Sequence, residues 1–291
     1  LYTVPSDKIV SIYNGVDVRP FDVRVDVKSI RARHAIGVDD PCILFAGRLA
    51  WQKGPDLLVE AMPRVLRDHP KEKFVFAGDG DMRADLEAQV GAARSTPAAR
   101  FVGYRKGAEL VGLFKSADVV CVPSRNEPFG IVILEAWSAS KPVVATRTGG
   151  PAEFVRHEDT GLTVSSDGPS IGKGVGAMLS DSANARRMGL NGRREAETRF
   201  SWDTIAAQTE AVYLSMNGRG SRSAASAAGP TQEITKMPSP TGKTRPIDAP
   251  CTRRPVRDRP SSPADKLTAD EIRCRAYEIY LARNGAPGDP N

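Results

Sequence analysis

The feature that most constrains the fold is an alternation, along residues 1–218, of short apolar runs with longer segments of helical period. The runs ILFA (43–46), FVFA (74–77) and DVVCV (118–122) contain almost no polar residues, which is typical of strands buried on both faces. The alternation predicts an α/β fold, a doubly wound parallel sheet with helices on both faces. We expect strands at residues 42–47, 73–77, 100–103, 117–123, 142–146 and 162–164, and helices at 56–68, 82–93, 106–115 and 131–140.

Length and composition fit a globular protein. The chain has 291 residues, of which 40% are hydrophobic and 26% charged, a balance that excludes a fully disordered or fibrous chain. No apolar run approaches the roughly 18 residues needed to cross a bilayer. The four cysteines form no C-x-x-C pair and the histidines lack ligand spacing. We therefore expect reduced thiols, no metal site and a cytoplasmic protein, with peripheral attachment to the inner face of the membrane as an alternative location.

The net charge of +6 lies in one segment. Residues 219–260 hold nine basic and three acidic side chains and seven prolines, so this segment carries a surplus equal to that of the whole chain. Its composition indicates a flexible linker at residues 219–262, with weak contact to an anionic surface as the alternative. Residues 1–218 are nearly neutral, and we expect no nucleic acid as a partner.

The first candidate motif follows the apolar run CILFA. Gly47 allows close backbone approach at the end of the expected strand, and Arg48 and Lys53 place two cations in the same loop. A planar guanidinium and a compact ammonium suit a diphosphate. Two solvated loop cations are the alternative interpretation.

The second motif is Glu127-Pro128-Phe129-Gly130-Ile131, which follows DVVCVPS and leads into Glu135. A proline and a glycine at the expected start of a helix leave backbone amides free for a phosphate. The two glutamates could accept hydrogen bonds from hydroxyls at opposite ends of a ligand. Their spacing alone is more typical of structural residues, and it is their placement at an expected strand-to-helix turn that favours a binding role.

Paired glycines form a third motif, since Gly149 and Gly150 follow the expected strand PVVAT. They indicate close backbone approach to a ligand or to another loop, or a plain tight turn. A dinucleotide fingerprint is disfavoured, because Arg83 stands where the third glycine after Gly78 and Gly80 belongs. Neither a P-loop nor a G-x-S-x-G motif is present.

Taken together, the motifs resemble the C-terminal half of a retaining glycosyltransferase of family 4 (glycosyl transferases group 1), which has the two-domain GT-B architecture with Rossmann-like halves. The resemblance covers roughly residues 8–214. It rests on YNGVD (13–17), LFAGRLAWQKG (44–54), FAGDG (76–80), FVGY (101–104), ADVVCVPSRNEPFGIVILEAWSASKPVVAT (117–146), GG (149–150), TGL (160–162) and the closing segment FSWDTIAAQTEAVY (200–213).

The resemblance implies roles for charged residues. Arg48 and Lys53 correspond to the pair that binds the diphosphate of a sugar nucleotide. Glu127 corresponds to the carboxylate that faces the hydroxyls of the donor sugar, and these three are the implied catalytic residues. Glu135 corresponds to the carboxylate that accepts from the ribose hydroxyls.

It also implies a set of donor-binding backbone segments. The amides of Phe129, Gly130 and Ile131, at the start of the expected helix 131–140, would hold sugar and distal phosphate oxygens, and residues 102–105 would line the base. The implied donor-binding residues besides Glu135 are Gly47, Val102, Tyr104, Arg105, Phe129, Gly130, Ile131, Gly149 and Gly150.

The implied reaction is transfer of a sugar, with retention, from a UDP-, GDP- or ADP-linked donor to a glycan, lipid or small-molecule acceptor. Neither a metal nor a cofactor is implied, because Arg48, Lys53 and a helix dipole offset the charge of the leaving group. The acceptor proton would pass to the departing phosphate.

The sequence departs from the family in one respect: it lacks the N-terminal Rossmann-like domain that carries the acceptor site. We therefore expect that this chain supplies the donor-binding half and turns over poorly alone. Two alternatives stay open, a truncated nucleotide-sugar-binding module without catalysis and a sugar-nucleotide epimerase.

The pattern of residues 263–291, at the end of the chain, predicts one amphipathic helix. Thr268 and Glu271 match a capping box, and Asn284-Gly285 would end the helix. The segment is similar to a short bacterial domain of unknown function, which implies no chemistry.

Overall fold

The computed structural model describes Pro5 and residues 8–220. The chain divides into two units, Tyr13–Ile205 and a second that combines Leu1–Ile12 with Ala206–Asn291. Every strand of the described part belongs to the first unit. The expected helix at 263–291 lies outside the described residues, as does the expected linker beyond Gly220.

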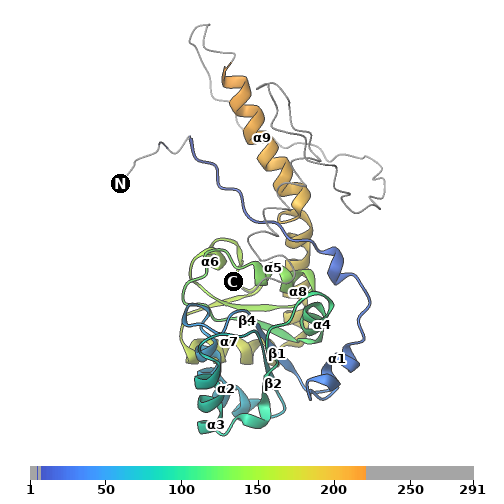
Figure 1. The fold of residues 1–291 in the computed structure, drawn as a ribbon, viewed down its shortest axis with the longest axis vertical. Coiled ribbons are helices and arrows are strands. Elements are labelled where there is room, and N and C mark those ends of the chain that lie inside the picture. The colour runs from blue at the N-terminus through green and yellow to red at the C-terminus, as the bar shows by residue number, and fades with distance from the viewer. Residues whose placement is uncertain (1–4, 6–7, 221–291) are drawn as a thin grey trace. The chain divides into compact units, whose positions relative to one another are not determined.

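A six-stranded parallel sheet forms the centre of the first unit (Figure 1). All six expected strands are confirmed, each within two residues of the predicted bounds. The strands run in the order β3-β2-β1-β4-β5-β6, which is the Rossmann-like order of a doubly wound sheet. Their bounds are β1 Cys42–Ala46, β2 Lys73–Ala77, β3 Ala99–Phe101, β4 Val119–Val122, β5 Val143–Thr146 and β6 Leu162–Val164.

The four expected helices are confirmed, and further helices accompany them. The expected helices are α2 Pro55–Asp68, α3 Arg83–Ala92, α4 Gly107–Ser116 and α5 Ile131–Ser138. The others are α1 Val27–Arg33, α6 Gly150–Phe154, α7 Gly168–Ser180, α8 Ser182–Thr198 and α9 Trp202–Gly220. None of the helices in the described part is both long and apolar enough to span a bilayer.

Glycines in α7 and α8 explain why the sequence alone did not predict these two helices. Glycine lowers helix propensity, but here it permits close packing. A Cβ on Gly174 would lie 2.9 Å from Val164, and one on Gly192 would lie 2.2 Å from the Trp137 ring. Tertiary contact therefore outweighs local propensity in both helices.

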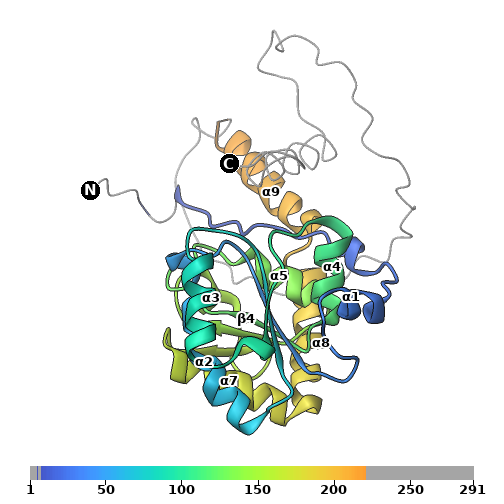
Figure 2. The same cartoon turned by 60° about the horizontal axis from the view of Figure 1, so that its bottom comes forward.

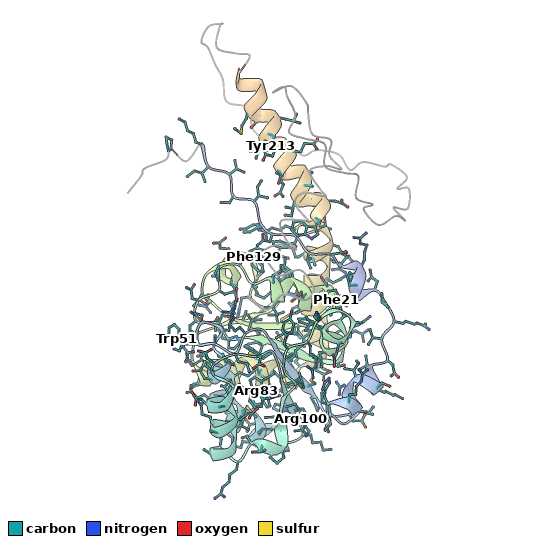
Figure 3. All side chains as sticks on the ribbon, viewed as in Figure 1. Phe21, Trp51, Arg83, Arg100, Phe129 and Tyr213 are labelled. Atoms are coloured by element: carbon teal, nitrogen blue, oxygen red, sulfur yellow. The ribbon has the colours of Figure 1, made fainter. Side chains whose placement is uncertain are left out.

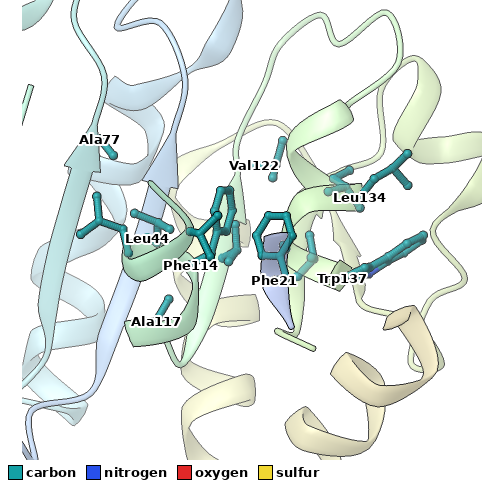
Figure 4. Packing of buried hydrophobic residues seen from close by; sticks show 14 of the residues in the cluster. Phe21, Leu44, Ala77, Phe114, Ala117, Val122, Leu134 and Trp137 are labelled. Carbon is teal, nitrogen blue, oxygen red and sulfur yellow. The ribbon is translucent and has the colours of Figure 1, made fainter. Parts of the chain in front are cut away.

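The helices cover both faces of the sheet, because side chains of each strand alternate between two hydrophobic clusters. In β1, Leu44 faces one cluster with α4 and α5, whereas Ile43 and Phe45 face the other with α2, α3 and α7. Figure 2 shows these helices on the two sides of the sheet. In the first cluster Phe114 and Trp137 supply large aromatic side chains (Figure 4). The two-sided burial predicted from the apolar runs is confirmed.

Candidate functional site

The candidate site lies where the strand order of the sheet reverses. Strands β1 and β4 are hydrogen-bonded neighbours, although β2 and β3 lie between them in sequence. Ligands of doubly wound sheets bind beyond the carboxyl ends of the strands at such a switch point. Lys53 follows β1 and Glu127 follows β4, so the topology brings the first two candidate motifs to one place.

Glycines hold the loop after β1 against the loop after β2. A Cβ on Gly78 would lie 1.8 Å from the carbonyl oxygen of Gly47, and one on Gly80 would lie 2.4 Å from that of Leu49. The Leu49 amide donates to the Asp79 carbonyl at 2.9 Å. The glycines of the rejected dinucleotide pattern thus serve contact between two loops.

A second close approach joins the loop after β1 to the end of β4. Trp51–Lys53 form a 3-10 turn (η3) that ends at Gly54, whose φ is 63°. A Cβ at Gly54 would lie 2.2 Å from the carbonyl oxygen of Pro123. Only glycine combines a positive φ with such a close contact to the backbone. Because of this contact, the turn that carries Lys53 lies against the loop after β4.

Lys53 and Glu127 form an ion pair, with 2.8 Å between Nζ and Oε2. The Glu127 side chain is 6% exposed and that of Lys53 is 35% exposed. Ser124 donates its hydroxyl to the same carboxylate oxygen at 3.1 Å. Two predicted site residues that lie 74 positions apart in the sequence are therefore in direct contact, and a buried carboxylate keeps a cationic partner.

Arg125 is a residue of this site that the sequence analysis missed. Its guanidinium makes two hydrogen bonds to the Asp56 carboxylate, at 2.8 Å and 2.6 Å. Its location two residues before Glu127, with an acidic residue soon after Lys53, is a signal that could have identified it. That signal marks Arg125 as a candidate, but its pairing with Asp56, 69 residues away, is visible only in the structure.

Gly149 and Gly150 approach the loop that carries Glu127. Gly149 has a φ of 60°, and a Cβ there would lie 2.2 Å from the Glu127 carbonyl oxygen. The Gly150 amide donates to the same oxygen at 2.9 Å. Of the alternatives for the paired glycines, the structure shows contact with another loop, and Gly150 begins the short helix α6.

Helix α5 begins beside Glu127 with unused amides. Gly130, with a φ of 97°, is the N-cap and offers no side-chain cap. Within the described residues, the amides of Phe129, Gly130 and Ile131 donate to no acceptor. The Phe129 ring instead packs on Phe154, with 5.3 Å between ring centroids. Free amides at a helix start form an anion-binding position.

Glu135 lies one turn further along α5 and is partly exposed. No hydrogen bond or ion pair of its side chain is found in the described part of the chain. Burial raises the pKa of its carboxyl to about 7. A carboxyl in this state is ready to accept hydrogen bonds from an incoming group.

The remaining predicted residues differ in their exposure to solvent. Arg48 is exposed, and Val102 packs against the first hydrophobic cluster. Tyr104 is 68% exposed. Arg105 pairs with Glu109 on α4, with 3.1 Å between Nε and Oε1.

Metal-ligating residues do not gather at this site. Throughout residues 8–220 no three side chains of His, Cys, Asp or Glu are grouped so as to hold a metal ion. Cys42 and Cys121 are free and buried. Burial raises the pKa of both thiols, that of Cys42 to about 12, so neither is a ready nucleophile.

Comparison with known families identifies the family of the chain. The family model described as "Glycosyl transferases group 1" matches residues 26–195. The chain belongs to this family. The matched residues include both loops of the Lys53–Glu127 pair and the whole of α5. The fold is that of the C-terminal, Rossmann-like domain of a GT-B glycosyltransferase.

Relatives and solved structures of the family extend the comparison. An "Uncharacterized glycosyltransferase MJ1607" of Methanocaldococcus jannaschii is 42% identical over 229 residues, which cover 75% of this chain and 58% of the relative. The crystal structure of Anabaena Alr3699/HepE in complex with UDP is 26% identical with a TM-score of 0.64, covering 70% of this chain and 57% of that one.

A third comparison concerns a single domain. The C-terminal domain of a glycosyl transferase group 1 family protein (LpcC) from Francisella tularensis has a TM-score of 0.58. At 23% identity it shares the fold, and the match covers 64% of this chain and 99% of that domain. The chain therefore spans a little over half the length of the M. jannaschii and Anabaena glycosyltransferases and nearly all of this isolated domain.

Proposed function

We propose that this chain is the donor-binding half of a retaining glycosyltransferase that transfers a sugar from a nucleotide-sugar donor. The observation that carries the proposal is the Lys53–Glu127 pair at the switch point of the sheet, beside the free amides at the start of α5. A cation, a carboxylate and a helix N-terminus in one place match the diphosphate and the sugar hydroxyls of such a donor.

Each part of the site has a task in this proposal. Lys53 and Arg48 bind the diphosphate, and the amides of Phe129, Gly130 and Ile131 bind phosphate and sugar oxygens. Glu127 accepts hydrogen bonds from the sugar hydroxyls. Glu135 accepts from the ribose, with Val102, Tyr104 and Arg105 beside the base and Gly47, Gly149 and Gly150 shaping the backbone around the donor.

The proposed chemistry breaks the bond between the anomeric carbon and the distal phosphate oxygen. The acceptor oxygen forms the new bond on the same face of the sugar, and its proton passes to the departing phosphate. Lys53, Arg48 and the dipole of α5 stabilise the charge that develops on the nucleoside diphosphate. These groups act without a metal or an organic cofactor in our proposal.

The donor nucleotide is proposed as UDP, with GDP and ADP as alternatives. Support comes from the Anabaena protein, whose structures were determined in complex with UDP and with UDP-glucose. The acceptor, a glycan, lipid or small molecule, would bind to an N-terminal domain, and the chain covers only 58% of the M. jannaschii protein and 57% of the Anabaena protein.

Calorimetric titration of the chain with UDP, GDP and ADP tests the proposal. We expect one nucleotide to bind saturably, and Lys53→Ala to weaken that binding by about 1.5–3 kcal/mol, the contribution of a charged hydrogen bond. Arg67→Ala is the matched control, because Arg67 pairs only with the exposed Asp68 among the described residues. Absence of binding by all three nucleotides, or an equal effect of the control substitution, would contradict the proposal.

A binding module without catalysis and a sugar-nucleotide epimerase are the other readings of the same site. The arrangement of Glu127 and Glu135 on either side of the α5 start, together with the GRL-x3-KG loop, favours transfer over epimerisation. Incubation with the nucleotide sugar separates these readings, since an epimerase converts the donor to its epimer without any acceptor.

A further inference from the structure

The side chain of Arg125 is held from three directions. Besides its two hydrogen bonds to Asp56, its Nη1 donates to the carbonyl oxygen of Trp51 at 3.0 Å. Its guanidinium carbon lies 5.0 Å from the centre of the Trp51 ring, within the range of a cation–π contact. Trp51 itself is 60% exposed and lies at the edge of the domain in Figure 3.

These contacts join the two loops that carry the Lys53–Glu127 pair. The amides of Arg125 and Asn126 both donate to the carbonyl oxygen of Gln52, at 2.9 Å and 3.3 Å. Gln52 directly precedes Lys53, and Arg125 precedes Glu127 by two residues. The contacts of Arg125 and its neighbour therefore lie beside the ion pair on both loops.

The pairing of Arg125 with Asp56 has the geometry of a rigid link. Both side chains are about one-fifth exposed, and Asp56 lies in the first turn of α2, directly after the loop of Lys53. A bidentate guanidinium–carboxylate pair fixes orientation as well as distance, whereas a lysine ammonium moves on a flexible stem. Apart from its ion pair with Glu127, Lys53 therefore depends on the backbone of the η3 turn for the place of its ammonium.

We propose that Arg125, fastened to Asp56, is a positioning residue that fixes the ammonium of Lys53 for the diphosphate of the donor. Arg125 acts through Lys53 and the η3 turn, and its guanidinium does not contact the donor. The inference rests on the proposed function for the identity of the ligand. The geometric part of the inference, that Arg125 keeps Lys53 beside Glu127, does not depend on the identity of the ligand.

The nucleotide test is a double-mutant cycle on binding. Calorimetry with UDP compares the wild type, Arg125→Gln, Lys53→Ala and the double variant. We expect Arg125→Gln to weaken UDP binding at least about fivefold, which is about 1 kcal/mol. In the Lys53→Ala background the same substitution should change the affinity less than about twofold, because residues in one network are not additive.

Matched variants separate positioning from general destabilisation. Arg156→Gln removes an arginine that is likewise paired with carboxylates, Asp159 at 2.7 Å and Glu195 at 3.1 Å, but lies outside the two loops of the Lys53–Glu127 pair, and it should leave UDP affinity unchanged. Arg125→Lys keeps the positive charge but cannot make both hydrogen bonds to Asp56 in the same geometry. Its UDP affinity should therefore lie between those of Arg125→Gln and the wild type. If Arg125→Gln does not fold, Asp56→Asn tests the same link from its other side.

A measurement without nucleotide separates this inference from the proposed function. Urea unfolding of Lys53→Ala, Glu127→Gln and their double variant gives the coupling between the two residues, and the cycle is repeated in the Arg125→Gln background. We expect that coupling to be lost without Arg125.

The outcomes are distinct. If the wild type binds none of UDP, GDP and ADP, the proposed function is wrong, and the urea cycle alone decides the role of Arg125. An unchanged coupling in the Arg125→Gln background overturns the inference. An equal loss of UDP affinity with and without Lys53 overturns it as well.

Discussion

Among the individual residues of the site, Glu135 combines partial exposure with a pKa raised by burial to about 7. In the unfolded chain this carboxyl titrates near its ordinary value of 4.5. Between these values the folded state binds more protons than the unfolded state. The free energy of unfolding should therefore fall as pH rises through this window, and the penalty is complete above about pH 7.

We predict that Glu135→Gln removes this loss of stability. The variant should gain stability relative to the wild type when pH is raised from about 5 to about 8, because it has no carboxylate to desolvate. Urea unfolding at both pH values measures the difference. Parallel pH profiles for the two proteins would show that the folded-state pKa of Glu135 is ordinary.

The same residue predicts a pH dependence of nucleotide binding. If Glu135 accepts hydrogen bonds from the ribose hydroxyls, UDP binds the ionised carboxylate better, and its affinity should fall on acidification through pH 7. Comparison with Glu135→Gln cancels the titration of UDP itself. Equal pH profiles of affinity would remove Glu135 from the proposed donor site.

Between elements, the fold depends on backbone contacts that leave no room for a side chain. Gly149 lies before α6 with a positive φ, and its Cα faces the carbonyl oxygen of Glu127. This contact fixes the loop after β5 against the loop after β4. The contact with Gly149 holds the backbone of Glu127 in place. Lys53 and Ser124 hold the Glu127 side chain.

We predict that Gly149→Ala lowers the free energy of unfolding by about 2–4 kcal/mol, the combined cost of backbone strain and steric overlap. UDP affinity should fall too, since Glu127 must move. Gly176→Ala in α7 is the matched control, because a Cβ there meets nothing within 4 Å. It should stabilise the protein by about 0.5–1 kcal/mol as alanine is the better helix former; urea unfolding of both variants measures the contrast.

The extent to which sequence predicted structure also differs between elements. The strands and α2–α5 were predictable because burial imposes an apolar run or a 3.6-residue period on the local sequence. Helices α7 and α8 were not, because Gly174 and Gly192 are explained only by the side chains that they face. Close approach between elements is a property of pairs of segments and leaves no local pattern.

The candidate site shows the same division. Lys53 and Glu127 were predicted as site residues from their loops, and the ion pair between them follows from the adjacency of β1 and β4. Arg125 was missed because its partner Asp56 lies 69 residues away. Single motifs indicate what a loop can bind, whereas tertiary structure decides which loops act together.

At the scale of the molecule, the chain spans a little over half the length of the M. jannaschii and Anabaena glycosyltransferases. All the proposed donor contacts fall between Gly47 and Gly150, inside one unit. Donor binding and acceptor binding should therefore separate experimentally.

We predict that the purified chain binds UDP but transfers sugar poorly, and that a supplied N-terminal acceptor-binding domain increases turnover. The physical reason is that the proposed donor-binding half would supply one wall of the reaction cleft and would not place an acceptor by itself. Transfer from a radiolabelled nucleotide sugar, with and without the added domain, measures this. Efficient transfer by the chain alone would contradict the prediction and exclude the module without catalysis.

In the proposed function, the ion pair between Lys53 and Glu127 gives the site a preference for complete donors. The Lys53 ammonium and the buried Glu127 carboxylate compensate each other's charge. A free phosphate that bound Lys53 would leave the buried Glu127 carboxylate without its cation, which costs free energy. A nucleotide sugar compensates both groups, since its phosphate takes the lysine while its hydroxyls take the glutamate. A ligand that carries both a phosphate and sugar hydroxyls would therefore displace the ion pair at a lower cost in free energy than a ligand that carries only one of these groups.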